Sequence, residues 1–139
     1  MVQLLLDVID GSVRHAEKHE PLMMRDVIKY IQAHLGEEFR LEELARQAGY
    51  SLSRFKVRFK EETGMSPRHY IVLKKIEAAQ QRLLAGSEPI SEIAGDLGFP
   101  TSQYFATVFS RFTGMTPTRY REEAARPHVP SRRREDRQG

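Results

Sequence analysis

The fold is decided by the stretch Gly49-Tyr50-Ser51-Leu52-Ser53-Arg54-Phe55-Lys56-Val57-Arg58-Phe59-Lys60-Glu61-Glu62-Thr63-Gly64-Met65-Ser66-Pro67, because the chain repeats it as Gly98-Phe99-Pro100-Thr101-Ser102-Gln103-Tyr104-Phe105-Ala106-Thr107-Val108-Phe109-Ser110-Arg111-Phe112-Thr113-Gly114-Met115-Thr116-Pro117. Each copy starts with a glycine and an aromatic residue, carries two phenylalanines four positions apart, and closes on Thr-Gly-Met-(Ser/Thr)-Pro. Such internal repetition indicates one structural unit that is built twice.

The first copy carries the local signals of a helix-turn-helix. Gly49 ends one helix and supplies the positive φ of a tight turn. Ser51 is the predicted N-cap of the next helix, on which Phe55 and Phe59 share one face because residues four apart are helical neighbours. The second copy repeats these signals at Gly98, Thr101, Phe105 and Phe109. A short helix, a glycine turn and a second helix are therefore expected twice.

The apolar spacing of the remaining chain predicts helices throughout. They are expected at residues 23–35, 41–48, 52–62, 67–84, 89–97, 102–113 and 117–124. The inner face of the long helix is predicted to be Val72, Leu73, Ile76, Ala79 and Leu83. We expect an all-α, seven-helix domain over residues 22–125, with helix-turn-helix subdomains at about 22–66 and 87–122. A connecting helix at about 67–85 would be roughly 26 Å long, suited to holding the two units about one duplex turn apart.

The two ends of the chain show weaker patterns. Residues 1–21 are predicted to form a leader or linker helix. They resemble the end of a linker that follows another domain, so the chain is expected to be either a fragment or a minimal regulator. His15 and His19 lie four apart, a spacing that suits a metal on a helix face, but no third ligand follows, so no metal site is expected. Residues 126–139 are basic and lack apolar periodicity, which predicts a disordered tail.

The charge distribution is more informative than the net charge of +3. Between residues 46 and 75 there are eight basic side chains against two glutamates, and residues 101–121 hold three arginines and no acid. Positive charge thus gathers on the repeated segments, as a surface that faces phosphates requires. The first turn of the helix after Ser51 has no carboxylate, which favours an approach to DNA.

The two repeated phrases resemble the AraC/XylS family of bacterial transcription regulators, over about residues 22–122. The second phrase, from Ser102 to Tyr120, is close to that family's signature. The resemblance implies a sequence-specific binding domain for double-stranded DNA, most often in an activator, with a recognition helix in each of two successive major-groove segments. It implies no cofactor. It also suggests RNA polymerase as a second partner. The isolated domain would be monomeric, whereas a longer parent protein could form a dimer through a preceding domain.

Carried onto this chain, the resemblance implies two sets of DNA-contacting residues. The base contacts would be Ser53, Lys56, Val57, Ser102, Gln103, Tyr104 and Thr107. The phosphate contacts would be Ser51, Arg54, Lys60, Arg68, Thr101, Arg111 and Arg119. Gln103 can pair bidentately with adenine, and Lys56 can donate to guanine. The chain departs from a frequent family pattern at Val57 and Thr107, where an arginine often contacts bases, so thymine methyls and DNA shape would carry more of the specificity.

Two other classes of protein fit the sequence less well. A scaffold of tandem helix pairs usually needs three or more repeats, and this chain has two with basic outer helices. An enzyme such as a DNA alkyl-transferase needs a thiolate acceptor, and the chain has no cysteine; its five histidines lie near no catalytic constellation. No secretion signal or membrane-spanning run is evident, so a cytoplasmic, nucleoid-associated protein without a membrane partner is expected.

Overall fold

The computed structural model describes residues 23–126, which fold into seven helices and no strand within that range. The helices are α2 (Met24–Ala33), α3 (Leu41–Gln47), α4 (Leu52–Thr63), α5 (Pro67–Ala85), α6 (Ile90–Asp96), α7 (Ser102–Thr113) and α8 (Pro117–Ala125). The all-α, seven-helix prediction is confirmed. The predicted leader at 1–21, with its histidine pair, and the predicted tail from residue 127 onward lie outside the described residues.

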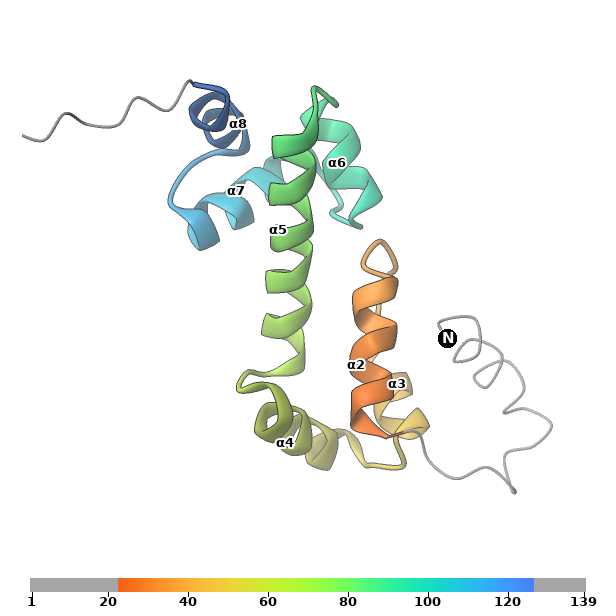
Figure 1. Cartoon of the computed structure of the whole chain (residues 1–139). Coiled ribbons are helices and arrows are strands. Elements are labelled where there is room, and N and C mark those ends of the chain that lie inside the picture. Colours follow the sequence, from red (N-terminus) through yellow and green to blue (C-terminus); the bar gives the residue numbers. More distant parts are fainter. Residues whose placement is uncertain (1–22, 127–139) are drawn as a thin grey trace, which may run out of the picture.

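The long helix α5 is shared by two separate hydrophobic cores. Its first turns place Tyr70 and Ile71 in a core with α2, α3 and α4, and its later turns place Ile76, Ala79 and Leu83 in a core with α6 and α7. Figure 1 shows the two groups of helices at opposite ends of this rod, whose 19 residues span about 28 Å. We call α2–α4 the first unit and α6–α8 the second unit.

The sequence repetition is reproduced in the packing of aromatic rings. Phe55 and Phe59 lie 5.6 Å apart in the first unit, and Phe105 and Phe109 lie 5.6 Å apart in the second. A tyrosine from the following helix meets the second phenylalanine edge-on in each unit: Tyr70 at 5.3 Å from Phe59 and Tyr120 at 5.4 Å from Phe109. Edge-to-face pairs at this distance are favoured arrangements. The four phenylalanines are fully buried.

The Thr-Gly-Met motif forms the same connection between helices in both units. Thr63 Oγ1 lies 2.9 Å from the carbonyl oxygens of Phe59 and Met65, and it accepts a bond from the Met65 amide at 3.2 Å. Thr113 does the same with Phe109 and Met115. The glycine between them takes the left-handed conformation at φ 85° and 84°. The motif therefore ends α4 and α7 and directs the chain into the helix that follows each.

Two expectations about helix α5 and its neighbour need correction. Helix α2 ends at Ala33, two residues before the predicted end, because the His34 amide bonds back to Ile31 and closes the last turn. In α5, the predicted inner residues Val72 and Leu73 are only partly buried. Their place is taken by residues on the adjacent faces, Tyr70, Ile71 and Lys75, because α5 serves two cores and not the single one that an apolar stripe assumes.

Only a long helix can cross a membrane, and α5 is the longest of the described helices. None of the described helices combines the length and the apolar character that crossing a bilayer requires.

Candidate nucleic-acid interface

The N-termini of α4 and α7 are built alike. Ser51 Oγ accepts a hydrogen bond from the Arg54 amide at 3.2 Å, and Thr101 Oγ1 accepts one from the Tyr104 amide at 2.9 Å. Each capping oxygen satisfies one helical amide and keeps its own hydroxyl hydrogen as a donor. Ser51 and Thr101, two of the predicted phosphate contacts, are therefore exposed N-caps whose hydroxyl groups can still donate to an anion.

Acidic residues are distributed unequally among the helix N-termini. The first turns of α2, α3 and α6 contain Asp26, Glu42, Glu43 and Glu92. The first turns of α4, α5, α7 and α8 contain none. Because carboxylates stabilise a helix N-terminus, their absence from one subset of helices needs a reason. An end without carboxylates does not repel an approaching phosphate.

The predicted base-reading side chains form the outer faces of α4 and α7. Ser53, Lys56 and Val57 are exposed on α4, while Gln103, Tyr104 and Thr107 are exposed on α7 and Ser102 is half-buried. Val57 and Tyr104 are large apolar side chains that are 56% and 53% exposed, and the Tyr104 ring lies 6.2 Å from that of Phe99. Figure 1 shows α4 crosswise at the lower end of α5 and α7 crosswise beside its upper half. The end of α7 also approaches the start of α5, since the Phe112 ring lies 5.3 Å from that of His69.

The predicted phosphate-contacting cations are mostly unpaired. Within residues 23–126, no ion pair involves Arg54, Lys60, Arg68 or Arg111, all of which are exposed. Arg119 differs, since its Nε lies 3.6 Å from a Glu123 carboxylate oxygen. Such an exposed pair is worth roughly 0–1 kcal/mol, so it can be exchanged for a phosphate at little cost.

Thr107 has only part of its hydrogen-bonding capacity left for a base. Its hydroxyl donates to the Gln103 carbonyl oxygen at 3.0 Å. The side chain can then offer a methyl group and an acceptor lone pair, but not a donor. This agrees with the expectation that apolar contacts replace strong donors at this position.

Two hollows beside α5 bring predicted site residues from both units together. One of about 460 Å³ is lined by Lys56 of α4 and Arg68 of α5, among others. The other, of about 630 Å³, is lined by Arg68 together with Tyr104 and Arg111 of α7. Arg68 therefore lies between the α4 face and the α7 face, although α7 is far from both α4 and Arg68 in the sequence. Ser51, Thr101 and Arg119 line neither hollow.

Three basic residues from the charge pattern are engaged within the protein: two bond to its backbone, and one pairs with a carboxylate on its surface. Lys75 is buried at 9% exposure, and its ammonium bonds to backbone carbonyls inside the domain. The Arg121 Nη2 donates to the Glu88 carbonyl oxygen at 2.6 Å. Arg58 is exposed, and its Nη1 lies 3.3 Å from a Glu61 carboxylate oxygen of the same helix.

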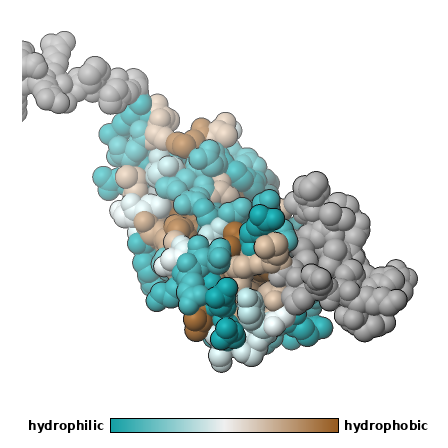
Figure 2. Space-filling model, turned by 60° about the horizontal axis from the view of Figure 1, so that its bottom comes forward, coloured by the Kyte–Doolittle hydropathy of each residue, from teal (hydrophilic) through white to brown (hydrophobic). Residues whose placement is uncertain are grey.

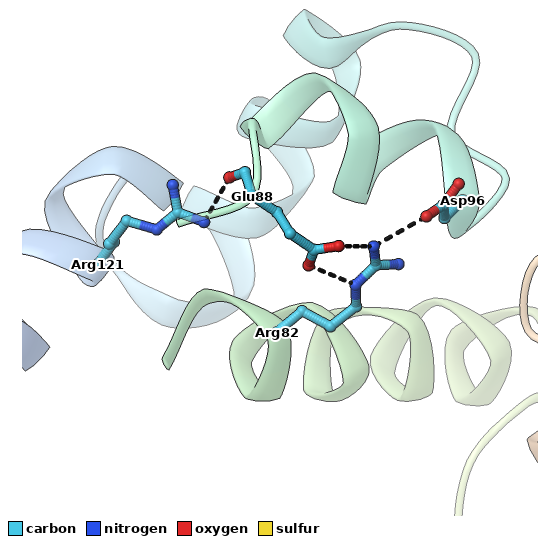
Figure 3. Close-up of polar contacts among 4 residues, drawn as sticks. All are labelled: Arg82, Glu88, Asp96 and Arg121. Carbon is cyan, nitrogen blue, oxygen red and sulfur yellow. Dashed lines mark hydrogen bonds and ion pairs between the residues drawn. The ribbon is translucent and has the colours of Figure 1, made fainter. Parts of the chain in front are cut away.

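Figure 3 shows the network that holds Arg121. Arg82 of α5 binds both carboxylate oxygens of Glu88, at 3.0 and 2.6 Å, and reaches the Asp96 carboxylate at 2.8 Å. The guanidinium of Arg82 lowers the pKa of Glu88 below its ordinary value. The network ties α5 to the ends of α6 and to α8. It fixes the second unit on the rod and leaves these charges unavailable to DNA.

Seen from the α4 end, the described surface is mainly hydrophilic, with hydrophobic residues in small separate areas (Figure 2). Among the described residues, no group of three histidine, cysteine or acidic side chains is placed to hold a metal ion. The surface thus offers cations, hydroxyls, an amide and isolated apolar groups. These are the groups that read the phosphates and base edges of a duplex.

Sequence reasoning missed the residues that join the two units, above all Lys75. The available signal was its position: it lies four residues after Ile71 and four before Ala79, on the buried stripe of α5. A lysine on such a stripe is seldom buried without a partner. The pattern could indicate burial, but not the carbonyl groups that receive the bond.

Comparisons with known proteins agree with this geometry. The profile of a family described as "Helix-turn-helix domain" matches residues 44–123, more than half of the chain. The probable transcriptional regulator LumQ of Photobacterium leiognathi is 34% identical over 104 residues, which are 75% of this chain. The matched proteins are transcription regulators and their DNA-binding domains, not enzymes.

Solved structures show the same fold. The DNA-binding domain of AdpA, a global transcriptional factor crystallised with a target DNA, superposes with a TM-score of 0.71 at 30% identity, over 76% of this chain and 97% of that one. A regulator with an AraC-type DNA-binding domain from Chromobacterium violaceum gives a TM-score of 0.68 over 76% of this chain and 94% of its own, and at 23% identity it supports the fold alone.

The chain spans less than half of the curated relatives that it matches. It covers 42% of LumQ. It covers 17% of the uncharacterised HTH-type transcriptional regulator SAS0078 of Staphylococcus aureus, to which it is 32% identical over 125 residues.

Proposed function

This chain belongs to the AraC/XylS-type family of helix-turn-helix transcription regulators, and from that premise we propose that it reads two successive major-groove segments of one DNA duplex, with α4 in one and α7 in the other. The observation that carries the proposal is the pairing of two alike-capped helices, free of acid in their first turns and with exposed polar faces, on one connecting helix. Successive major grooves recur about every 34 Å along a duplex, which is the separation that α4 and α7 would have to match.

The side chains divide into two roles under this proposal. Ser53, Lys56 and Val57 from α4 and Ser102, Gln103, Tyr104 and Thr107 from α7 face the bases. Arg54, Lys60, Arg68, Arg111 and Arg119, with the hydroxyls of Ser51 and Thr101, face phosphates. The unpaired state of Arg54, Lys60, Arg68 and Arg111 supports the second role, because an exposed cation without a carboxylate partner is available for an anion.

The two recognition faces differ in chemistry, which supports a division of labour. The α4 face combines Lys56 with the flanking cations Arg54 and Lys60, whereas the α7 face is mainly neutral, with Gln103 as its bidentate donor–acceptor. We expect α4 to contribute more of the salt-dependent affinity and α7 more of the adenine preference. Val57 and the Thr107 methyl would contact thymine methyl groups.

Family membership also supports a role as an activator that works with RNA polymerase. In vitro transcription from a promoter that carries the selected site tests this: added protein should raise the transcript yield, and a fall in yield would identify a repressor instead.

One copy of the chain carries both recognition helices, so we propose that the described domain binds as a monomer. Sedimentation of the complex should give one chain per duplex, and two chains would contradict the proposal. A function on chromosomal DNA supports a location in the bacterial cytoplasm, at the nucleoid.

The experiment that tests the main proposal is a selection from randomised duplexes followed by size-exclusion chromatography. The whole chain should enrich a bipartite sequence, and it should co-elute with that duplex but not with a scrambled one of equal length. Equal retention on both duplexes would contradict sequence-specific reading. Failure to co-elute with any duplex would favour the alternative of a protein-interaction module.

A further inference from the structure

The two units touch each other at a second place, apart from the rod that they share. Lys75 Nζ of α5 donates to the Leu35 carbonyl oxygen at 2.6 Å and to the Leu97 carbonyl oxygen at 2.6 Å. Leu35 belongs to the loop after α2 in the first unit, and Leu97 ends α6 in the second. Figure 1 shows that loop reaching up to the end of α6. One buried ammonium thus joins backbone from both units.

Two glycines make this contact possible. A Cβ on Gly36 would lie against the Asp96 carbonyl oxygen, closer than real Cβ atoms approach. A Cβ on Gly98 would lie 2.8 Å from Lys75 Nζ and 3.0 Å from the Gly36 carbonyl oxygen. Neither position has room for a side chain while the units stay together. We call Lys75, Gly36 and Gly98, with the carbonyl groups of Leu35 and Leu97, the joint.

The chemistry of the joint suits a permanent link. Carbonyl groups at the end of a helix lack an intrahelical partner and carry partial negative charge, so an ammonium is a favourable partner for the Leu97 oxygen. Burial lowers the pKa of Lys75. A neutral amine would still have two N–H groups, one for each carbonyl. The ring of Phe99, 5.8 Å from Nζ, adds a favourable face for the cation.

The joint leads directly to both recognition helices. Leu35 packs on the hydrophobic cores of both units, and the core of the first unit includes Phe55 of α4. On the other side, Gly98 and Phe99 form the turn that precedes α7, and the Phe99 ring lies 5.0 Å from Phe105 of that helix. A shift at the joint would therefore move α4 relative to α7. Without the joint, α5 would be the main link between the units, and α4 and α7 could change their relative position whenever α5 bends or its packed helices roll against it.

We propose that Lys75 is a positioning residue that sets the distance and angle between α4 and α7, so that the chain accepts only one spacing between its two DNA elements. This inference rests on the proposed reading of two major-groove segments, and it adds the part of the protein that measures their separation. A preformed separation increases affinity because binding of the second helix loses no further freedom. It also penalises other spacings, since one inserted base pair turns the second element by about 35°.

The test uses the whole chain and three kinds of duplex. The first is the bipartite site selected by this chain, the second has one element scrambled, and the third has one base pair inserted between the elements. Dissociation constants are measured at one salt concentration for the parent chain, Lys75→Met and Gly36→Ala. Lys75→Met leaves both carbonyls without their donor, and Gly36→Ala wedges the units apart at a residue whose φ is not in the left-handed region. If Lys75→Met fails to fold, Gly36→Ala still decides the question.

Two matched variants control for effects unrelated to the joint. Lys74→Met removes the neighbouring charge of α5, whose ammonium binds Glu77 at 3.1 Å. Gly95→Ala adds a methyl group to α6 where nothing lies within 4 Å. Both controls should behave like the parent chain on all three duplexes. Circular dichroism confirms that each variant is folded at the assay temperature.

The expected results separate the inference from the proposed function. The parent chain should lose at least about tenfold in affinity on the inserted duplex, as for a mismatched site. Lys75→Met and Gly36→Ala should bind the selected site about tenfold more weakly, lose less than about threefold more on insertion, and keep the parent's affinity for the single element. An undiminished insertion penalty in folded variants overturns the inference alone. A parent chain that is insensitive to both scrambling and insertion overturns the two-groove function and the inference with it.

Discussion

The salt dependence of DNA binding can be estimated from the described surface. Five cations are assigned to phosphates: Arg54, Lys60, Arg68, Arg111 and Arg119. Each neutralised phosphate contributes about −0.9 to the slope of log affinity against log salt concentration, so five contacts predict a slope of about −4.5. Between 50 and 200 mM salt the affinity should then fall about 500-fold.

Single substitutions should change this slope by a defined amount. Lys60→Ala or Arg111→Ala removes one contact and should bring the slope to about −3.6, which is a fall of about 150-fold over the same range. The ratio of affinities for the selected and the scrambled duplex should not change. Lys29→Ala is the matched control, since Lys29 is an exposed lysine of α2 and belongs to neither α4 nor α7, so it should leave the slope at the parental value.

Fluorescence anisotropy at six or more salt concentrations measures the slope directly. A parental slope close to zero would refute the electrostatic account of the whole surface. A parental slope near −4.5 that neither Lys60→Ala nor Arg111→Ala reduces would instead remove these two residues from the phosphate contacts. If Lys29→Ala reduced the slope equally, the effect would come from net charge and not from the assigned positions.

Three further predictions concern base reading, stability and acid sensitivity. Gln103→Ala and Lys56→Ala should each relax the preference for one base pair, by about 1–3 kcal/mol at its own position, as measured with a set of singly mutated duplexes; an equal loss on all sequences would contradict a reading role. Phe59→Ala and Phe109→Ala should each lower the free energy of urea unfolding by about 3–5 kcal/mol, because both rings are fully buried in equivalent contacts, and a large difference between them would contradict the structural repetition. Arg82 holds the pKa of Glu88 below its ordinary value of 4.5, so the ionised carboxylate stabilises the folded state above that pH, and this contribution is lost as pH falls through the lowered pKa. The stability difference between the parent chain and Glu88→Gln should therefore shrink below about pH 4.5 in urea titrations, and a constant difference would show that Arg82 does not act on the charge.

The local part of the structure could be predicted from the sequence because it depends on residues close together in the chain. Ser51 and Thr101 cap their helices as expected, and Gly49 and Gly98 both take a φ of 81° in the turns. The phenylalanine pairs are buried as their spacing predicts. In each case the residue type has a strong preference that a few neighbours decide.

The contacts between the units could not be predicted in this way. Lys75 binds carbonyl groups that are 40 and 22 residues away, and Arg82 reaches Asp96 across 14 residues. Backbone carbonyls carry no side-chain signature, so nothing in the residue types marks Leu35 and Leu97 as acceptors. Charge counting therefore assigned Lys75 and Arg121 to the outer surface, where an unpaired basic residue would normally lie.

The roles of individual DNA-facing residues rest on helix phase and chemistry. Gln103 and Lys56 are exposed on the expected faces, but exposure on a recognition helix does not distinguish a base contact from a phosphate contact. That distinction depends on how deeply each helix enters its groove. The depth is set by the complex with DNA and not by the domain alone.

The central claim is that α4 and α7 occupy neighbouring major-groove segments on one side of the same duplex. A major-groove protection footprint on the selected site tests it most directly, with the parent chain and with Gln103→Ala. The account predicts two protected clusters about 10–10.5 base pairs apart, of which Gln103→Ala weakens only the one under α7. A single protected cluster, or two clusters on opposite sides of the duplex, would contradict it.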